Sequence, residues 1–520
     1  MFFPKLLQDF LSLTAKASPD KSALICADRL MTYAELNRNS TQLANLLQQN
    51  GIKRGDRVII LLDNSIEVVV SLFGILKNDS VFIILSSSTK SRSLNYILKD
   101  SGALLIITDV KRKNIIDEVF SDPKIDCKVL WIDGDEQSKL VSKHEYLFWD
   151  NISKYHTDLS TPSCNIDIDI AALIYTSGTT GRSKGIICTH RSMVSAALSI
   201  IQYLEIESSE IILSVLPLSF DYGLYQVLMS IIFGGTVIIK KNFLFINEIL
   251  KDIEKYKVTG FPIVPTIITM LLNLKNLSKY DLSSIRYMTN TGAALPVEHI
   301  KNIRSVLPHV KFYSMYGLSE CKRVMYLPPD EIDLRPGSVG KAMPNCEVFI
   351  LDEKDEKVAA GVVGELVVRG SNLMSGYWNA PELTEKKYRH GKNGFEKLLY
   401  TGDYFKQDEN GYLYFVGRID EMIKCKGERV SPKEVEETIC ELKGVAEAAV
   451  IGIDDIMLGQ AVKAFVVLTQ DTNIDSKTIL QHCANSLEDF KTPKYVEIVN
   501  SIPKSPNGKI DRKSLLEMKQ

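Results

Sequence analysis

Two hydrophobic periods alternate along the first three quarters of the chain. Thr32-Tyr-Ala-Glu35 has the form of a capping box and predicts the start of a helix. An apolar side chain then recurs on one face, at Leu36, Leu43 and Leu47. Gly51 ends this helix, and the apolar run at residues 58–62 predicts a strand. Because the same alternation continues to about Val368, we expect an α/β architecture with mainly parallel sheets.

The stretch AALIYTSGTTGRSKGII, residues 171–187, breaks an apolar run with glycines and hydroxyls. It predicts a strand, a loop and a second strand, followed by a helix that begins near Thr189. Glycines let a backbone turn tightly, and the hydroxyls and N–H groups can surround phosphate oxygens. The common phosphate loop requires Gly-Lys-Ser/Thr, whereas Lys184 follows Ser183 and precedes Gly185. A phosphate is nevertheless the first ligand we expect here.

The character of the sequence changes near Gly417, where charged residues become frequent. Ser431-Pro-Lys-Glu434 then predicts a new helix with proline at its first position. About a hundred residues follow, which is enough for a small domain. We therefore expect a large domain at residues 1–419 and a small domain at 420–520, with the boundary at Asp420.

The composition is that of an ordinary globular protein. The 520 residues are 45% hydrophobic and 24% charged with a net charge of −2, and nothing suggests nucleic acid as a partner. The first residues have no signal-peptide pattern, and the longest apolar stretch, 227–239, is too short to span a bilayer. Nine scattered cysteines without a Cys-x-x-Cys pair argue against a disulfide framework and a zinc site. A cytoplasmic location fits best.

Six further motifs belong together by their order. They are YTSGTTGRSKG (175–185), TGAALP (291–296), YGLSE (316–320), YTGD (400–403), GRIDEMIKCKGERVSPKEVE (417–436) and PKSPNGKIDR (503–512). In sequence and spacing the chain resembles the adenylate-forming superfamily of acyl-CoA synthetases, adenylation domains and firefly luciferase, as a stand-alone member. The resemblance implies an α/β fold whose large N-terminal domain has mainly parallel sheets and a β-barrel-like subdomain, with a small mobile α+β C-terminal domain.

The resemblance also implies an ATP- and Mg²⁺-dependent ligase. A carboxylate attacks the α-phosphorus of ATP, pyrophosphate leaves, and a thiol captures the acyl-adenylate. That thiol would belong to CoA or to the phosphopantetheine of a free-standing carrier protein. Because no carrier segment follows Lys509 in this sequence, we expect the thiol partner to be a separate molecule.

Roles for individual residues follow from the same resemblance. It assigns the β and γ phosphates to Thr176, Ser177, Gly178, Thr179, Thr180 and Lys184. It assigns the adenine to Tyr316 and Gly317, with Gly292, Ala293 and Ala294 on the other side. Asp403, assisted by Arg418, would accept hydrogen bonds from the ribose. Glu320 would bind Mg²⁺, and Ser319, at a position mostly occupied by threonine, would meet the α-phosphate or an acyl oxygen.

Lys509 is implied as the main catalytic lysine, because it would stabilise charge on the pentavalent phosphorus. Asp420 matches the hinge about which the small domain rotates between the two half-reactions. Lys424 would then serve the adenylate, while Lys426 and Gly427 would line the thioester-forming side and the pantetheine tunnel.

The acid site is the least specific part of the resemblance. Its implied residues are Phe220, Asp221, Tyr222, Pro265 and Thr266. A Phe-Asp pair here indicates an amino acid, because the aspartate would meet the substrate's ammonium group in amino-acid-activating relatives. Asp221 could equally serve a turn or a local hydrogen bond, or face another polar substrate. The identity of the acid stays open.

Two other classes of function compete with the ligase. A non-catalytic nucleotide-binding scaffold would have lost the lysine or the glutamate, and both Lys509 and Glu320 are present. A luciferase-like oxygenase uses the same adenylation step, but no residue in the sequence calls for it.

Overall fold

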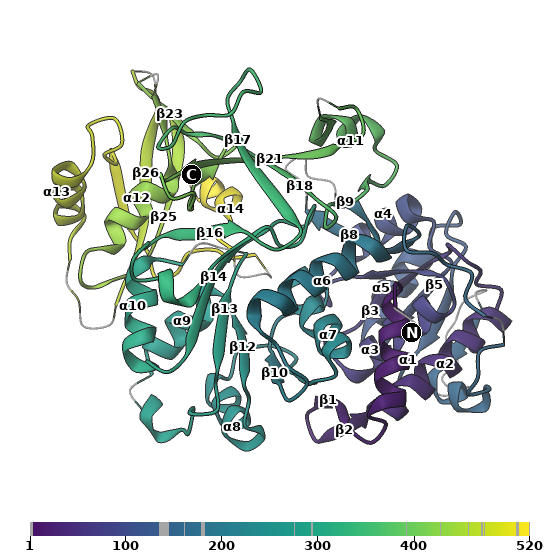
Figure 1. Cartoon of the computed structure of the whole chain (residues 1–520). Helices are drawn as coiled ribbons and strands as arrows, with labels where there is room; N and C mark the ends of the chain where they lie inside the picture. Colours follow the sequence, from purple (N-terminus) through teal and green to yellow (C-terminus); the bar gives the residue numbers. More distant parts are fainter. Residues whose placement is uncertain are drawn as a thin grey trace.

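The computed structural model describes residues 4–134, 145–160, 162–177, 183–274, 276–292, 295–391, 393–426, 428–455, 457–469, 472, 474–505 and 509–518. Three sheets and their covering helices make up this part of the chain. The purple N-terminal region lies at the right of the molecule and the yellow C-terminal region at the left (Figure 1).

The first sheet has eight strands and is parallel except at one edge, where β9 runs against both of its neighbours. Its order is β19 (Gly376–Tyr377), β9 (Ser183–Thr189), β8 (Ile170–Ser177), β4 (Val81–Ile84), β3 (Arg57–Leu61), β5 (Leu105–Thr108), β6 (Lys128–Trp131) and β7 (Tyr146–Phe148). Successive residues of β3 enter different cores, since Val58 and Ile60 belong to one buried cluster and Ile59 and Leu61 to another. A strand that is apolar on both faces is typical of a parallel sheet covered by helices on both sides.

The second sheet has fourteen strands. Its main path is β17 (Cys346–Leu351), β18 (Gly364–Gly370), β21 (Lys397–Gln407), β22 (Leu413–Arg418), β16 (Ser338–Ala342), β15 (Met325–Leu327), β14 (Lys311–Tyr316), β13 (Tyr287–Asn290), β12 (Gly260–Ile263), β10 (Ile211–Ser214), β11 (Thr236–Ile239), β1 (Ser22–Cys26) and β2 (Arg29–Thr32), and β20 (Tyr388–His390) pairs with β21. Neighbouring strands are parallel along the path from β1 through β11, β10, β12 and β13 to β14. The pairs of β14 with β15 and of β15 with β16 are antiparallel.

Helices cover these two sheets and fill the space between them (Figure 1). They are α1 (Leu7–Ala17), α2 (Tyr33–Gln49), α3 (Ile66–Lys77), α4 (Ser91–Ser101), α5 (Lys113–Phe120), α6 (His190–Leu204), α7 (Asp221–Phe233), α8 (Ile246–Tyr256), α9 (Pro265–Leu272), α10 (Val297–Val306) and α11 (Pro381–Lys387). One continuous buried cluster joins α1, α2, α3, α6 and α7 to strands of both sheets. Both sheets are therefore parts of one large body.

The third sheet belongs to the C-terminal region. Its strands are β24 (Glu428–Val430), β23 (Ile423–Cys425), β26 (Gly459–Leu468) and β25 (Val445–Asp455), with β27 (Tyr495–Ile498) on β26. Helices α12 (Pro432–Cys440) and α13 (Ser476–Ser486) pack on one face and α14 (Arg512–Glu517) on the other. The region thus has buried clusters of its own, as a small domain requires.

The predicted architecture is confirmed as mixed α/β, with a large N-terminal and a small C-terminal domain. The resemblance also implies a β-barrel-like subdomain; the described strands contain no closed barrel, and antiparallel strands form one end of the fourteen-stranded sheet. Local predictions are also confirmed. Thr32 caps α2, Thr189 caps α6 after the strand, loop and strand, and Ser431 caps α12.

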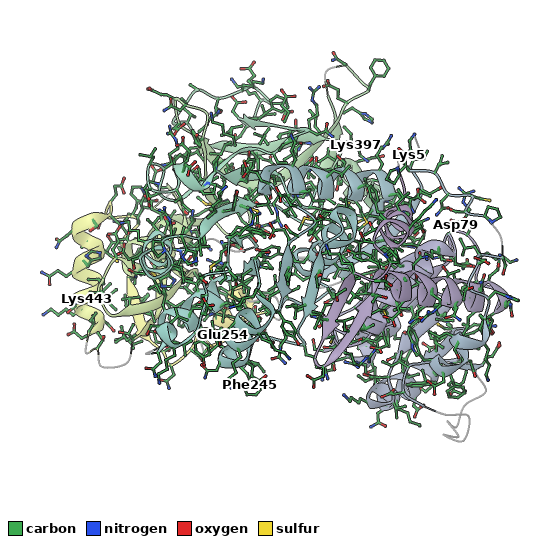
Figure 2. All side chains as sticks on the ribbon, turned by 60° about the horizontal axis from the view of Figure 1, so that its bottom comes forward. Lys5, Asp79, Phe245, Glu254, Lys397 and Lys443 are labelled. Carbon is green, nitrogen blue, oxygen red and sulfur yellow. The ribbon has the colours of Figure 1, made fainter. Side chains whose placement is uncertain are left out.

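The surface carries mixed charged and polar side chains (Figure 2). Exposed apolar residues are scattered, and Phe245, 66% exposed before α8, lies at the rim of the view in Figure 2. Within the residues that the structure describes, no helix combines the length and apolar character needed to cross a membrane.

Candidate active site

Three of the nucleotide candidates meet on the fourteen-stranded sheet, at the ends of β14 and β22 and within β21. Tyr316 is the last residue of β14, Arg418 is the last of β22, and Asp403 pairs with Arg418 across β21 and β22. The Tyr316 hydroxyl donates a hydrogen bond to the Asp403 carboxylate, and Arg418 Nη1 lies 3.5 Å from Asp403 Oδ1. Asp403 is only 4% exposed. Its buried Oδ1 accepts no hydrogen bond from the described residues, so it is free to accept one from a ligand hydroxyl.

Two opposing effects act on this carboxylate. Burial raises the pKa of Asp403, and the charge of Arg418 and the hydrogen bond from Tyr316 lower it. Burial raises the pKa of Tyr316, and the charge of the Asp403 carboxylate raises it further. The result is a fixed acceptor whose neighbours orient it.

The ring of Tyr316 is part of an aromatic group. It meets Phe405 edge-on at a centroid distance of 4.9 Å and stacks with Phe415 at 6.3 Å. The chain turns sharply at the next residue, because a Cβ on Gly317 would lie 2.0 Å from the Lys322 carbonyl oxygen. Glycine at 317 is therefore needed for the loop that carries Glu320 to fold back onto β14.

Glu320 lies on the loop between β14 and β15 and is held by two tyrosines. The Tyr377 hydroxyl donates to Glu320 Oε1 at 2.7 Å, and the Tyr388 hydroxyl donates to the Glu320 carbonyl oxygen at 3.0 Å. The described residues contain no group of three or more His, Cys, Asp and Glu side chains that could hold a metal. A Mg²⁺ bound mainly by phosphates and water needs only one or two carboxylates, and the partly buried Glu320 fits that requirement.

Lys509 reaches this site from the small domain. Its Cε lies 3.9 Å from the position that a Cβ on Gly292 would occupy. Lys509 retains accessible surface, yet protein atoms crowd its ammonium group. This burial lowers the pKa of Lys509 and the charge of Arg418 lowers it further, against the opposing charges of Asp403 and Glu320. Among the described residues no carboxylate forms an ion pair with Lys509, and the carboxylates of Asp403 and Glu320 are near enough to act on its pKa.

The glycine-rich loop is framed by described strands. Thr176 pairs with Lys184 and Ser177 with Ser183 at the ends of β8 and β9. Gly178, Thr179, Thr180, Ala293, Ala294 and Gly427, which were predicted to contact ligands, lie outside the described residues.

The predicted acid-site residues lie around the start of α7. Phe220 precedes this helix, and its Cζ lies 3.2 Å from the Cβ position of Gly292. The buried Tyr222 hydroxyl contacts the carbonyl oxygen and Oγ1 of Thr289 at 2.5 and 2.6 Å. Pro265 and Thr266 begin α9, and the buried Oγ1 of Thr266 has no hydrogen-bond partner in the described structure.

Asp221 forms an ion pair that the sequence did not reveal. Lys322 Nζ lies 2.9 Å from Asp221 Oδ1, and the two side chains are 2% and 13% exposed. Burial opposes the charge of Lys322, but the Asp221 carboxylate outweighs it and raises the pKa of the lysine. Lys322 is thus charged and already neutralises the carboxylate that was considered for a substrate ammonium group.

Comparison with known families identifies the chain. Residues 11–378 match the model of the AMP-binding enzyme family, and residues 434–509 match that of the AMP-binding enzyme C-terminal domain. This chain is an AMP-binding enzyme.

Its relatives support the same classification over the whole length. The long-chain-fatty-acid–CoA ligase of Bacillus subtilis is 32% identical over 541 aligned residues, which cover 99% of this chain and 94% of that protein. A part of gramicidin S synthase 2 of Brevibacillus brevis is 29% identical over 98% of this chain, which spans 11% of that protein.

Solved structures of similar proteins superpose closely. ATP-bound MatB from Rhodopseudomonas palustris has a TM-score of 0.89 at 27% identity, with 99% of both chains covered. The anthranilate CoA ligase AuaEII in complex with anthranoyl-AMP has a TM-score of 0.90 at 28% identity, covering 99% of this chain and 98% of that one.

The resemblance to the adenylate-forming superfamily and the prediction of an AMP-forming acid–thiol ligase are confirmed by these matches. The roles of single residues stay predictions. Gly292, Glu320, Asp403, Arg418 and Lys509 do gather in one place, as those roles require.

Lys424 and Lys426 lie elsewhere, on the exposed surface of the small domain. Lys424 is in β23, and Lys426, in the turn after it, has a φ of 53° and pairs with Asp489. Asp420 follows β22 and accepts a hydrogen bond from Arg418 Nε at 2.9 Å. The residue expected at the hinge therefore contacts Arg418, one of the residues predicted to bind the nucleotide.

Sequence reasoning missed Lys322, Arg323 and Tyr377. The signal for the first two was available, because two adjacent cations follow Glu320 and precede the apolar Val324-Met325. Charged residues are almost never fully buried unless paired, so buried cations at that place indicate partners from elsewhere in the fold.

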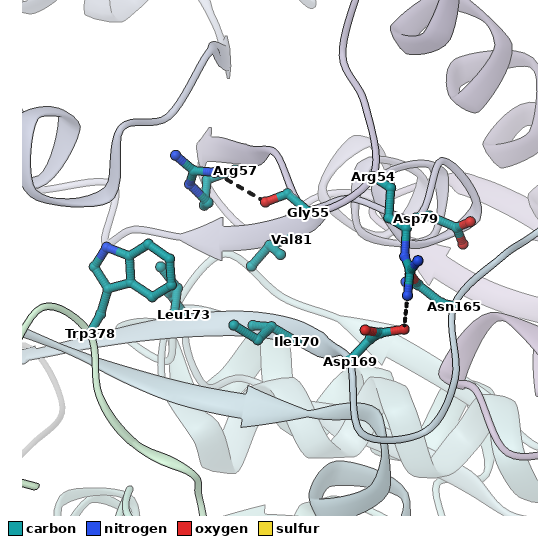
Figure 3. A pocket seen from close by; sticks show the side chains of 10 residues that line it. All are labelled: Arg54, Gly55, Arg57, Asp79, Val81, Asn165, Asp169, Ile170, Leu173 and Trp378. Atoms are coloured by element: carbon teal, nitrogen blue, oxygen red, sulfur yellow. Dashed lines mark hydrogen bonds and ion pairs between the residues drawn. The ribbon is translucent and has the colours of Figure 1, made fainter.

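A separate pocket opens at the other end of the eight-stranded sheet (Figure 3). It includes Arg57, Val81 and Ile170, the first residues of β3, β4 and β8. The glycine-rich loop follows the opposite end of β8, so this pocket is distinct from the candidate active site. Arg54 pairs with Asp169 within it.

Proposed function

We propose that this AMP-binding enzyme is an acyl-CoA ligase, which converts a carboxylic acid and ATP to an acyl-adenylate and pyrophosphate and then transfers the acyl group to CoA. The observation that carries the proposal is the reach of Lys509 from the small domain to Gly292, beside Glu320, Asp403 and Arg418. The relatives named for CoA ligation support CoA as the thiol.

In the first half-reaction, each group of the cluster has a distinct task. Asp403 accepts hydrogen bonds from the ribose hydroxyls through Oδ1, which accepts none from the described residues, and the Tyr316 ring offers a flat surface to the base. Glu320 holds Mg²⁺, which would neutralise phosphate charge when bound. Lys509 places its ammonium between the attacking carboxylate and the α-phosphate, and stabilises the negative charge that grows there.

Lys509 is exposed in the structure, and bound ATP and acid would shield its ammonium group from water. An ammonium group held away from bulk water interacts more strongly with an anion, because fewer water dipoles screen it. The carboxylates near Lys509, those of Asp403 and Glu320, are assigned to the ribose and to Mg²⁺. A bound triphosphate would thus supply the negative charge that pairs with the Lys509 ammonium.

The second half-reaction would use another arrangement of the small domain. Rotation about Asp420 would withdraw Lys509 and bring Lys426 and its neighbours toward the adenylate. The contact between Asp420 and Arg418 supports a link between this hinge and the nucleotide, because a change at either residue disturbs the other.

Amino-acid activation with transfer to a free-standing carrier protein is the second candidate. The match to a part of gramicidin S synthase 2 favours it. The ion pair between Asp221 and Lys322 counts against it, since a substrate ammonium group would have to displace an internal cation.

The direct test is release of AMP and pyrophosphate from ATP with a panel of acids, each with CoA or a holo-carrier protein, followed by mass analysis of the thioester. We expect acid-dependent AMP and an acyl-CoA product. Lys509→Ala should lose most adenylation and keep ATP binding. Lys504→Ala is the matched control, because Lys504 lies on the same segment but pairs with Glu447.

Two results would refute the proposal. No acid-dependent AMP with any acid excludes the ligase, and acylation of the carrier without acyl-CoA formation establishes the second candidate. Equal activity of the two lysine variants would remove Lys509 from its assigned role.

A further inference from the structure

Arg323 lies inside the large domain, behind the candidate acid site. It is 7% exposed and follows Lys322 on the segment that leads into β15. Its Nη1 donates to Thr291 Oγ1 at 2.7 Å, and its guanidinium carbon lies 5.2 Å from the centroid of the Tyr222 ring. The hydroxyl of Tyr203 is also near it.

These neighbours are neutral. Among the described residues, no carboxylate comes within ion-pair distance of Arg323, and its buried Nε has no hydrogen-bond partner. Asp221 is taken by Lys322, the residue before Arg323. Arg323 therefore has no carboxylate partner among the described residues.

An uncompensated buried cation is unfavourable, and folded proteins normally pair such a group or satisfy its donors. In an enzyme, a ligand can supply the missing anion. Tyr222 and Thr291 hold the guanidinium in place without neutralising it, which leaves its charge available to such a ligand.

The position of Arg323 relates it to the acid. Its partner Thr291 directly precedes Gly292, the residue next to which Lys509 and Phe220 converge. Under the proposed function, the reacting carboxylate lies beside Lys509. Arg323 contacts the residue beside Gly292, and a short substrate whose reacting carboxylate meets Lys509 would extend its far end toward this guanidinium.

We infer that Arg323 receives a second anionic group of the substrate, so that the enzyme prefers a short dicarboxylic acid. The inference rests on the proposed function and names its acid. A guanidinium offers a carboxylate two parallel N–H donors, which favours a planar anion over a hydroxyl or an apolar tail. Lys322 keeps Asp221 neutralised and so removes the group that would otherwise repel this second carboxylate.

Matched pairs of acids test the inference. Succinate and butyrate have equal chain length and differ in one carboxylate, as do glutarate and pentanoate. Dodecanoate represents a long apolar tail, and aspartate and glutamate add an ammonium group. The readout is kcat/KM for acid-dependent pyrophosphate release with wild-type enzyme, Arg323→Met and Arg323→Lys.

The wild-type enzyme should prefer the better dicarboxylate over its partner by at least ~100-fold, because a site built for a polar group strongly rejects the analogue that lacks it. Arg323→Met should reduce that ratio to near one, mainly by raising KM for the dicarboxylate. Arg323→Lys should restore part of it. The dicarboxylate should also raise the melting temperature of the wild-type enzyme and leave that of Arg323→Met unchanged.

Arg112→Met is the control for burial. Arg112 is also 7% exposed, but it pairs with Asp63 and Asp109, which are not among the predicted acid-site residues. This variant should lose stability and keep the wild-type ratio of the two acids. Arg323→Met should melt near the wild-type temperature, since no carboxylate is stranded by its removal.

Several outcomes overturn the inference. They are a wild-type preference for butyrate, pentanoate or dodecanoate, a preference for the amino acids, or an acid ratio that Arg323→Met does not change. Arg323 would have a structural role if three results occurred together. Arg323→Met would fail to fold, Arg323→Lys would keep the wild-type ratio of the two acids, and dicarboxylates would not shift the melting temperature. All of these differ from failure of the proposed function, in which no acid would release pyrophosphate.

Discussion

Lys77 should make the stability of the large domain depend on pH. Its ammonium group is buried between α2 and α3, with the residue 5% exposed. It donates to the carbonyl oxygen and Oδ1 of Asn37 at 2.8 and 2.7 Å and to Thr41 Oγ1 at 2.8 Å. In the described part of the chain no carboxylate lies within ion-pair distance, so neutral acceptors alone stabilise the charge.

Burial lowers the pKa of Lys77 to about 7, whereas the unfolded chain has the ordinary value of about 10.4. Between these values the unfolded chain binds the proton and the folded protein does not. The free energy of unfolding therefore rises with pH in this window, by about 1.4 kcal/mol for each unit. From pH 7 to pH 9 the contribution of this one group amounts to roughly 2 kcal/mol, because the folded group is still half protonated at pH 7.

The variant Lys77→Met removes the titrating group and keeps much of its apolar volume. Urea unfolding at several pH values, followed by tryptophan fluorescence, measures the difference. All three tryptophans, Trp131, Trp149 and Trp378, precede the small domain, so the signal reports on the large one. Wild-type protein should gain roughly 2 kcal/mol relative to Lys77→Met between pH 7 and pH 9.

The exposed Lys16 on α1 provides the control, and Lys16→Met should follow the wild-type pH profile. Parallel profiles for wild type and Lys77→Met would show that Lys77 keeps its proton in the folded protein over this range. The reasoning from burial would then be wrong.

Three further predictions concern the active site. Lys322→Met should destabilise the enzyme by about 3–5 kcal/mol because it strands Asp221, and adding Asp221→Leu should recover most of the loss in a thermal double-mutant cycle; additive losses would contradict the pairing. Tyr377→Phe removes the hydrogen bond to Glu320, so kcat/KM for MgATP should fall about fivefold, from roughly 1 kcal/mol; an unchanged value would mean that Glu320 needs no support. Asp420→Pro should reduce thioester formation more than adenylation, measured as separate half-reactions, because proline restricts the φ angle that a hinge must change; equal loss of both would argue against a hinge there.

The elements that the sequence predicted best depend on local rules. Thr32, Thr189 and Ser431 cap helices because a hydroxyl just before an apolar-periodic segment satisfies N–H groups that any helix start exposes. Such signals act within a few residues, and no knowledge of the rest of the fold is needed to see them.

The partners of charged residues could not be predicted in this way. Asp221 and Lys322 are 101 residues apart in the sequence, and Arg323 and its hydrogen-bond partner Thr291 are 32 residues apart. These contacts exist because α7, β13 and the segment after β14 come together in three dimensions. The sequence correctly marked Asp221 as a residue to explain, but its observed partner, Lys322, is neither the turn nor the local hydrogen bond that was considered.

The order of the cluster along the chain has a consequence for damaged or unfinished protein. Glu320, Asp403 and Arg418 all precede Lys509, which comes from a separate, later domain. A polypeptide cut or stopped between Arg418 and Lys509 keeps the three residues proposed to bind the nucleotide and Mg²⁺ but lacks the proposed catalytic lysine. Under these proposed roles, such a fragment would bind ATP without consuming it.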